Sequence, residues 1–282
     1  MAKKLKLSNN KQKWVDKFNP NVIVGEPLRP NYEIEKNTVR KVERLTDKMI
    51  KEFEREVIKL FKKESPSYFA QDASISSQVR ILLNKLEDKF YSMFKLEGNS
   101  IANYMTNSVN RHSKAQMQNS LSKLSGGLSI NVKDLSAETK ETLKASASQA
   151  ASYIRSIQAE YLDQAAGFTY RSITQGEGLK DLIPQLQVLS GKTRRNARLL
   201  ALDQTRKTNA TLDEARMRQN GITKFRWNHS SAGKTQRKTH VEFDGQIYSL
   251  DDPPYDRDAK QNVMPAQLPY CRCFKTPVIE FN

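Results

Sequence analysis

The sequence predicts a mainly α-helical protein, with a long-helix N-terminal region followed by a small α+β C-terminal module that contains a short antiparallel sheet. Two observations predict this fold class. From about residue 39 to residue 189, apolar residues recur every three or four positions, which is the period of one helix face. After Gly221 the pattern changes to short alternating segments and proline-rich stretches, which are typical of strands and loops.

Residues 1–34 are predicted to form a basic extended arm. Six lysines lie in the first 20 residues, and the prolines and glycine that follow cannot sustain a regular element. The arm could follow a DNA backbone, clasp a neighbouring subunit or be a solvated tail, and the sequence leaves these alternatives open. The lysines expected to contact DNA are Lys3, Lys4 and Lys6.

Residues 35–190 are predicted to form a long-helix bundle. Its apolar stripes begin near Val39, after Pro66, near Asp134 or Ser136, and after Gly178. The second stripe continues past Gly98 to the break at Ser125-Gly126-Gly127, and Ser190-Gly191 is expected to end the last one. Stripes of this kind form the core of a bundle far more often than a ligand site.

Residues 191–282 are predicted to form the C-terminal module. It starts with a polar helix from about Thr193 to Asn220, which Gly221 caps. Two strands follow, at Ile222–Trp227 and Gln246–Leu250, and Asp244-Gly245 makes the turn before the second strand. The proline-rich stretch between residues 251 and 269 is predicted to be loop.

The charge of the chain favours an acidic partner. With 47 Lys and Arg against 31 Asp and Glu, the formal net charge is +16, which attracts polyanions such as double-stranded DNA without sequence specificity. Lysines that keep a helical surface solvated are the alternative explanation. Besides the arm, the candidates for non-specific DNA binding are Arg194, Arg195 and Arg198 at the start of the polar helix.

The sequence gives no sign of a membrane span or of secretion. It contains no run of 18 apolar residues, and its basic start lacks the apolar stretch of a secretory signal. The chain is therefore expected to be made in a cytoplasm. Its only two cysteines are separated by one residue, so they cannot build a disulfide framework.

His240, Cys271 and Cys273 are candidate ligands of a structural zinc ion. One imidazole and two thiolates are ligands that zinc favours, and a module with little regular structure needs a further source of stability. A fourth ligand is missing from this set, and His229 is the candidate for it. In the alternative interpretation the cysteines are small buried packing residues and no metal is bound.

Four polar residues lie within two turns of the predicted polar helix: Asp203, Gln204, Lys207 and Asn209. Asp203 and Lys207 are four residues apart and can pair on one face. These side chains could orient the terminal module, touch a phosphate, or form polar contacts that hold the helix to the strands.

An ordered series of short motifs runs through the last third of the chain. Its parts are Asp203-Gln204-x-x-Lys207-x-Asn209, Gly221-Ile222, Trp227, Arg237-x-x-His240, Asp244-Gly245, Asp251-Asp252-Pro253-Pro254, Pro265, Cys271-Arg272-Cys273 and Pro277. This series resembles the phage Mu F-protein family of minor head, or head morphogenesis, proteins, from about Tyr170 to the C-terminus. The motif residues are expected to organise the module, among them Trp227, Arg237, Asp244 and Gly245.

The resemblance implies a structural protein of a bacteriophage virion and no enzyme. Such a protein is built in at low copy near the portal during head morphogenesis, in the head interior or at the portal vertex. Its partners would be the portal and the major capsid or scaffold proteins, together with packaged double-stranded DNA, with which some members are ejected. Whether the chain forms a homo-oligomer stays open.

The sequence departs from the family pattern at two places. Met264 stands before Pro265 where a histidine is expected, and Gly233-Lys234 stands where an acidic pair normally precedes Arg237. The alternative function is a metal-dependent nuclease acting on phage or host DNA. One histidine with distant carboxylates does not supply the base, the hydrated ion and the acids that phosphodiester hydrolysis needs.

Overall fold

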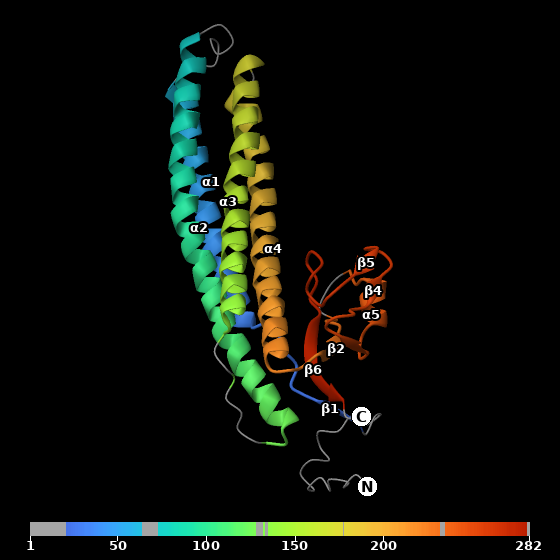
Figure 1. Ribbon diagram of the computed structural model, residues 1–282. Helices are drawn as coiled ribbons and strands as arrows, with labels where there is room; N and C mark the ends of the chain where they lie inside the picture. The colour runs from blue at the N-terminus through green and yellow to red at the C-terminus, as the bar shows by residue number, and fades with distance from the viewer. Residues whose placement is uncertain are drawn as a thin grey trace, which may run out of the picture. The chain divides into compact units, whose positions relative to one another are not determined.

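The computed structural model of the chain describes residues 21–63, 73–127, 132, 135–176, 178–231 and 235–280. The described residues form four long helices, one short helix and short antiparallel strands, most of which follow the long helices in the chain (Figure 1). This confirms the predicted fold class. The chain divides into two compact units. One contains residues 36–105 and 146–202, and the other contains residues up to 35, 106–145 and from 203 onward. We call them the helical unit and the sheet unit.

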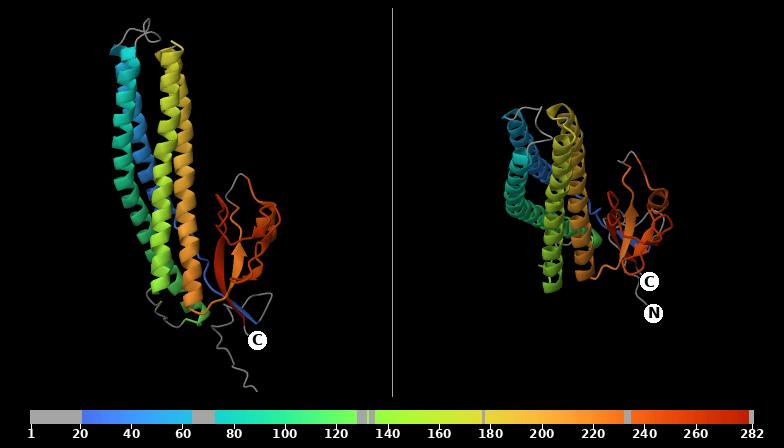
Figure 2. Two further views of the ribbon diagram at one scale, coloured as in Figure 1. Left: turned by 45° about the horizontal axis from the view of Figure 1, so that its top comes forward. Right: turned by 90° about the horizontal axis from the view of Figure 1, so that it is seen from above.

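The helical unit is a bundle of segments from four helices, α1 (Tyr32–Lys63), α2 (Ala73–Leu124), α3 (Ala137–Thr174) and α4 (Leu179–Gln219). Figures 1 and 2 show these segments side by side. Their apolar stripes meet in one continuous core, in which Phe53 and Tyr161 pack edge to face at 5.6 Å between ring centroids. The stripes predicted from the sequence are therefore bundle core.

Side-chain caps fix where two of the helices begin. The Asn31 side chain accepts a hydrogen bond from the backbone N–H of Glu33, at 2.9 Å, so α1 starts at Tyr32, earlier than the apolar stripe itself. Ser136 Oγ accepts one from the N–H of Thr139, at 3.1 Å, at the start of α3. These caps satisfy donors that have no partner inside the helix.

The predicted break at Ser190-Gly191 is wrong, because α4 runs without interruption from Leu179 to Gln219. A helical glycine costs about 1 kcal/mol relative to alanine. Burying one leucine such as Leu189 contributes about 1.5–3 kcal/mol, and Ser190 donates a hydrogen bond to Glu54 at 2.7 Å. Tertiary packing therefore outweighs the local preference to break.

The sheet unit is built on a four-stranded antiparallel sheet in the order β1-β6-β2-β3. Its strands are β1 (Val22–Val24), β2 (Lys224–Asn228), β3 (Ile247–Ser249) and β6 (Phe274–Glu280). A second pair contains β4 (Tyr255–Asp256) and β5 (Gln261–Asn262), and α5 (Lys238–Glu242) lies between β2 and β3 in the chain. The two predicted strands are present as β2 and β3, and they pair with each other.

The arm predicted for residues 1–34 is wrong at its C-terminal end. Residues 22–24 form β1 and pair with residues 278–280 of β6, and the Gly25 N–H donates to Pro277 O at 2.8 Å. Extended backbone with free N–H and C=O groups can complete a sheet edge even where its local sequence favours no regular element. The lysines Lys3, Lys4 and Lys6 lie outside the described residues.

A buried polar seam joins α4 to α2 and β6 inside the sheet unit. Asp213 of α4 accepts hydrogen bonds from Ser113 Oγ, at 2.6 Å, and from Asn209 Nδ2. Lys275 of β6 is 2% exposed and donates to Glu214 at 3.2 Å. The polar composition of the second half of α4 is explained by these contacts, because buried polar groups require partners.

The two units do not follow the predicted segments 35–190 and 191–282. Residues of α2, α3 and α4 are divided between the units at positions 105/106, 145/146 and 202/203. The predicted boundaries, after residues 34 and 190, lie inside α1 and α4, and the divisions between the two units also fall inside helices. Among the described residues, no helix is long and apolar enough to cross a membrane.

Candidate functional site

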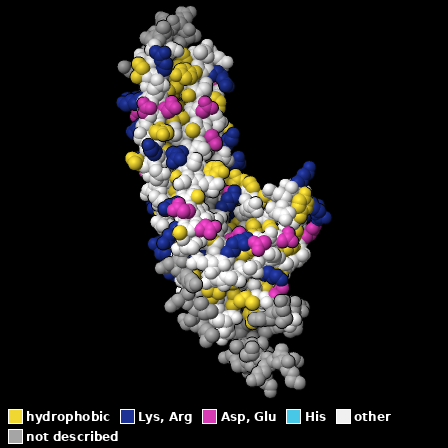
Figure 3. All heavy atoms as spheres, viewed as in Figure 1, with side chains coloured by type: hydrophobic (Ala, Val, Ile, Leu, Met, Phe, Trp, Pro, Cys, Tyr) yellow, Lys and Arg dark blue, Asp and Glu magenta, His cyan; other side chains and the backbone are white. Residues whose placement is uncertain are grey.

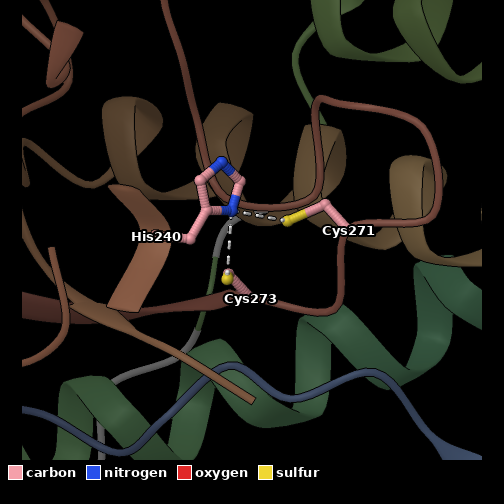
Figure 4. Close-up of side chains that lie close together, drawn as sticks. All are labelled: His240, Cys271 and Cys273. Carbon is pink, nitrogen blue, oxygen red and sulfur yellow. Dashed lines mark hydrogen bonds between the residues drawn. The ribbon is translucent and has the colours of Figure 1, made fainter. Parts of the chain in front are cut away.

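The candidate site is a buried cluster of one imidazole and two thiols in the sheet unit (Figure 4). His240 comes from α5, and Cys271 and Cys273 come from the segment that leads into β6. The imidazole Nδ1 lies 3.4 Å from Cys271 Sγ and 3.5 Å from Cys273 Sγ. All three side chains are buried, with exposed fractions of 2% or 3%. Cys271 and Cys273 follow His240 by 31 and 33 positions in the sequence, and the fold brings both sulfurs to one nitrogen of its ring.

Asp256 holds the other nitrogen of the ring. Its Oδ2 lies 3.1 Å from His240 Nε2, and it is 0% exposed. A carboxylate only accepts hydrogen bonds, so Nε2 carries the proton and donates it, which leaves the lone pair of Nδ1 directed to the sulfurs. Burial by itself raises the pKa of Asp256, but the N–H groups of Ala259 and Asp258 outweigh it and keep that pKa below its usual value.

The two thiols differ in pKa, in opposite directions from the usual value. The pKa of Cys271 falls to about 4, because its sulfur accepts a hydrogen bond from Cys273, which outweighs the opposing effect of burial. The same hydrogen bond, together with burial, raises the pKa of Cys273. The pair therefore readily carries one negative charge beside the imidazole. Both cysteines are free of disulfide bonds.

Aromatic rings enclose the cluster. Trp227 of β2, which is 0% exposed, meets the His240 ring edge to face at 5.1 Å between centroids. Phe243 stacks on the same imidazole at 6.0 Å and packs against Trp227 at 5.2 Å. Apolar rings on two sides exclude water and strengthen the electrostatic interactions within the cluster.

His229 is not part of the cluster. The grouping of ligand side chains among the described residues contains His240, Cys271 and Cys273, and His229 lies outside it. Its backbone N–H instead donates to Asp244 Oδ1 at 2.7 Å. The short loop after β2 thus directs this residue into a turn contact, and the expectation of His229 as fourth ligand is not met.

The remaining motif residues of the loops make contacts that shape the module. The Arg237 guanidinium donates to Pro269 O at 2.9 Å, two residues before Cys271. Gly245 has a φ of 77°, a left-handed conformation that the turn between α5 and β3 requires, and its N–H donates to Trp227 O at 2.9 Å. Gly233-Lys234, the departure from the family pattern, lies outside the described residues.

The polar residues of α4 bind the helix to the cysteine segment and to the polar seam. Asp203 accepts a hydrogen bond from the N–H of Tyr270 at 2.7 Å and pairs with Lys207 at 2.8 Å. Gln204 is buried, and Asn209 donates to Asp213. Asp203 therefore anchors the backbone immediately before Cys271.

The three arginines considered for DNA binding differ in their surroundings. Arg195 and Arg198 are exposed on α4, whereas Arg194 pairs with Asp47 at 2.6 Å within the helical unit. On the face drawn in Figure 3, cationic and acidic side chains are interspersed over the described residues. Arg195 and Arg198 are thus the two of the three best placed to meet a phosphate.

Sequence reasoning missed Asp256. This residue lies 16 positions from His240 in a stretch predicted to be loop, and no spacing rule connects the two. The complete set, two sulfurs, an imidazole nitrogen and a carboxylate that fixes the ring, is suited to holding a soft metal ion or to a purely packed interior. Its burial keeps it away from any large substrate.

Comparison with known proteins identifies part of the chain. Residues 163–276 match the family described as Phage Mu protein F like protein. An uncharacterized protein of Haemophilus influenzae is 30% identical over 219 residues, which cover 77% of this chain and 47% of that protein. The chain therefore spans about half the length of this relative. No solved structure matches the chain.

Proposed function

Because residues 163–276 belong to the Phage Mu protein F like family, we propose that this chain is a minor head protein of a tailed bacteriophage, built into the virion near the portal during head morphogenesis. The family indicates a phage head morphogenesis protein. The single observation that carries the proposal is that the matched region includes most of the sheet unit's C-terminal part, with the buried cluster and its anchor Asp203. That part is a compact folded unit, which supports a role in docking to other head proteins.

We extend this proposal to the packaged genome. A net charge of +16 favours contact with duplex DNA, because each neutralised phosphate releases counterions. The contact would be one with the phosphate backbone, because a net positive charge attracts DNA without reading its base sequence. The exposed residues Arg195 and Arg198 are the candidate contacts among those described, and ejection of the chain with the DNA is a further part of the proposal.

The location of the chain is tested on purified particles. Quantitative mass spectrometry of mature virions, empty heads and portal-deficient assemblies measures the copies of the chain in each. The proposal expects a low copy number in virions and empty heads, and loss of the chain from assemblies that lack the portal. Absence from mature virions contradicts the proposal.

DNA binding is tested by titrating duplex DNA at several salt concentrations. Affinity is expected to fall steeply with salt, and the double variant Arg195→Gln, Arg198→Gln is expected to reduce the slope of log K against log salt by about 0.9 for each phosphate that it no longer neutralises. The matched control is Lys62→Gln with Lys85→Gln, two exposed lysines of the helical unit that remove the same charge. Equal slopes for both double variants contradict a role of the two arginines.

The nuclease alternative gains no support from the geometry. His240 is 2% exposed and Asp256 0%, so a phosphodiester has no access to either side chain. Both ring nitrogens are already engaged by Asp256 and the cysteines. A general base must reach the proton it removes, directly or through one water molecule.

A further inference from the structure

We infer that His240, Cys271 and Cys273 form a structural zinc site that ties α5 to the segment entering β6. The juxtaposition that carries this inference is the meeting of one imidazole Nδ1 and two sulfurs, whose ligand atoms all lie within 4.8 Å of one another. Each residue offers one ligand atom, and all three side chains are buried. The site is independent of the proposed role in the phage head.

The spacing of the atoms agrees with the edges of a zinc coordination tetrahedron. With Zn–S of about 2.3 Å and Zn–N of about 2.0–2.1 Å, a tetrahedral ion separates a nitrogen and a sulfur ligand by about 3.5 Å. The two nitrogen–sulfur distances in the cluster are 3.4 and 3.5 Å. Two edges of the tetrahedron therefore already have the length that a zinc ion would require.

Asp256 orients the imidazole in the way that a carboxylate does in many metal sites. Histidines that bind metals usually donate the proton of their second nitrogen to a carboxylate or carbonyl, which fixes the tautomer and orients the ring. Here His240 Nε2 donates to Asp256, and the N–H groups of Asp258 and Ala259 hold that carboxylate in turn at 2.9 and 3.1 Å. With Nε2 donating to Asp256, the lone pair of Nδ1 points to the two sulfurs, where a metal ion would lie.

The chemistry of the ligands selects the metal. Thiolates and imidazole favour zinc over magnesium or calcium, which bind to oxygen. Zinc binds both sulfurs as thiolates, so the proton that the pair still holds goes to solvent, and the two thiolates neutralise the charge of the ion. The described residues supply three ligands, so a water molecule or another small ligand takes the fourth position.

The position of the ion explains how an irregular segment is held. Residues 250 to 273 contain only the two-residue strands β4 and β5. An ion on His240 would fix α5 to the cysteine segment, and Asp256 would connect β4 to the same centre. Metal binding to such a module contributes directly to its folding.

Metal analysis of the full chain tests the inference. The protein is produced without a histidine tag and kept reduced, and zinc is measured by inductively coupled plasma mass spectrometry. About one zinc per chain is expected. Removal of zinc with a chelator is expected to lower the melting temperature, and zinc chloride is expected to restore it. Protein that holds no zinc, and whose melting temperature does not rise with added zinc, overturns the inference.

Three variants separate ligands from neighbours. His240→Ala is expected to lose zinc, and the matched control His229→Ala to keep it, because His229 lies outside the cluster. Asp256→Asn tests the positioning residue and is expected to weaken zinc affinity about 10–100-fold. If His240→Ala fails to fold, the zinc affinities of the wild-type chain and of Asp256→Asn are compared by competition with a chromophoric chelator, and this comparison tests the site without the His240 variant. Retention of zinc by folded His240→Ala, or equal affinities of wild type and Asp256→Asn, contradicts the assignment.

Discussion

The buried carboxyl of Asp213 is expected to make the stability of the chain depend on pH. This side chain is 2% exposed in the polar seam of α4. Burial raises its pKa from 3.8 to about 7, although the Ser113 hydrogen bond and the charges of Lys275 and Arg216 act in the opposite direction. Between these pH values the folded chain holds a proton that the unfolded chain has released.

The sign and size of the effect follow from this difference. The stabilisation is complete below pH 3.8, the unfolded value, and is lost as the pH rises through about 7. In this window the folded state binds about one more proton, so the free energy of unfolding falls by about 1.4 kcal/mol per pH unit. Over roughly 3 units the decrease reaches about 4 kcal/mol, a large part of the roughly 5–15 kcal/mol typical of folded proteins.

Asp213→Asn removes this titration and provides the test. Urea unfolding followed by circular dichroism gives the free energy of unfolding of both proteins between about pH 5 and about pH 7. The free energy of unfolding of the variant, relative to that of the wild type, is expected to rise by about 1.4 kcal/mol for each pH unit. Asp163→Asn, an exposed acid of α3, is the control and should show a constant difference from the wild type. A constant difference for Asp213→Asn would refute the reasoning.

Three further substitutions test the packing and caps of the fold. Trp227→Ala empties a fully buried position and is expected to cost about 3–5 kcal/mol of unfolding free energy, measured by urea denaturation. Gly25→Ala places a Cβ against Ser120 Oγ, which accepts the N–H of Glu26. Either Ser120 rotates and this hydrogen bond is lost, or β1 shifts, so faster hydrogen exchange at Glu26 and in β1 is expected, and unchanged exchange counts against the clash. Ser136→Ala removes the acceptor for the Thr139 N–H and is expected to destabilise α3 by about 1 kcal/mol, which a melting curve detects; an unchanged melting temperature contradicts the cap.

The periodic part of the fold was accessible from the sequence. A helix buries residues three and four positions apart, so the stripes that include Phe53 and Tyr161 predicted the bundle core directly. The alternating segment before Trp227 and the Asp244-Gly245 turn predicted β2 and β3 in the same local way. Short spacing also singled out the Cys271 and Cys273 pair.

Other features depend on contacts that no local pattern encodes. Residues 22–24 become a strand because β6 offers them an edge, more than 250 positions later in the chain. The helix α4 passes through Ser190-Gly191 because buried neighbours offset a weak local break.

The candidate site also combines features that the sequence predicts with features that depend on tertiary contacts. By itself the sequence singled out His240 and the two cysteines as candidate ligands, because ligand chemistry is a property of the side chains. Only the tertiary structure decided that Asp256 orients the imidazole and that His229 lies elsewhere. The cost of closing a loop depends only weakly on its length, so sequence separation does not tell which partner a loop residue will meet. The folding of the whole module decides this.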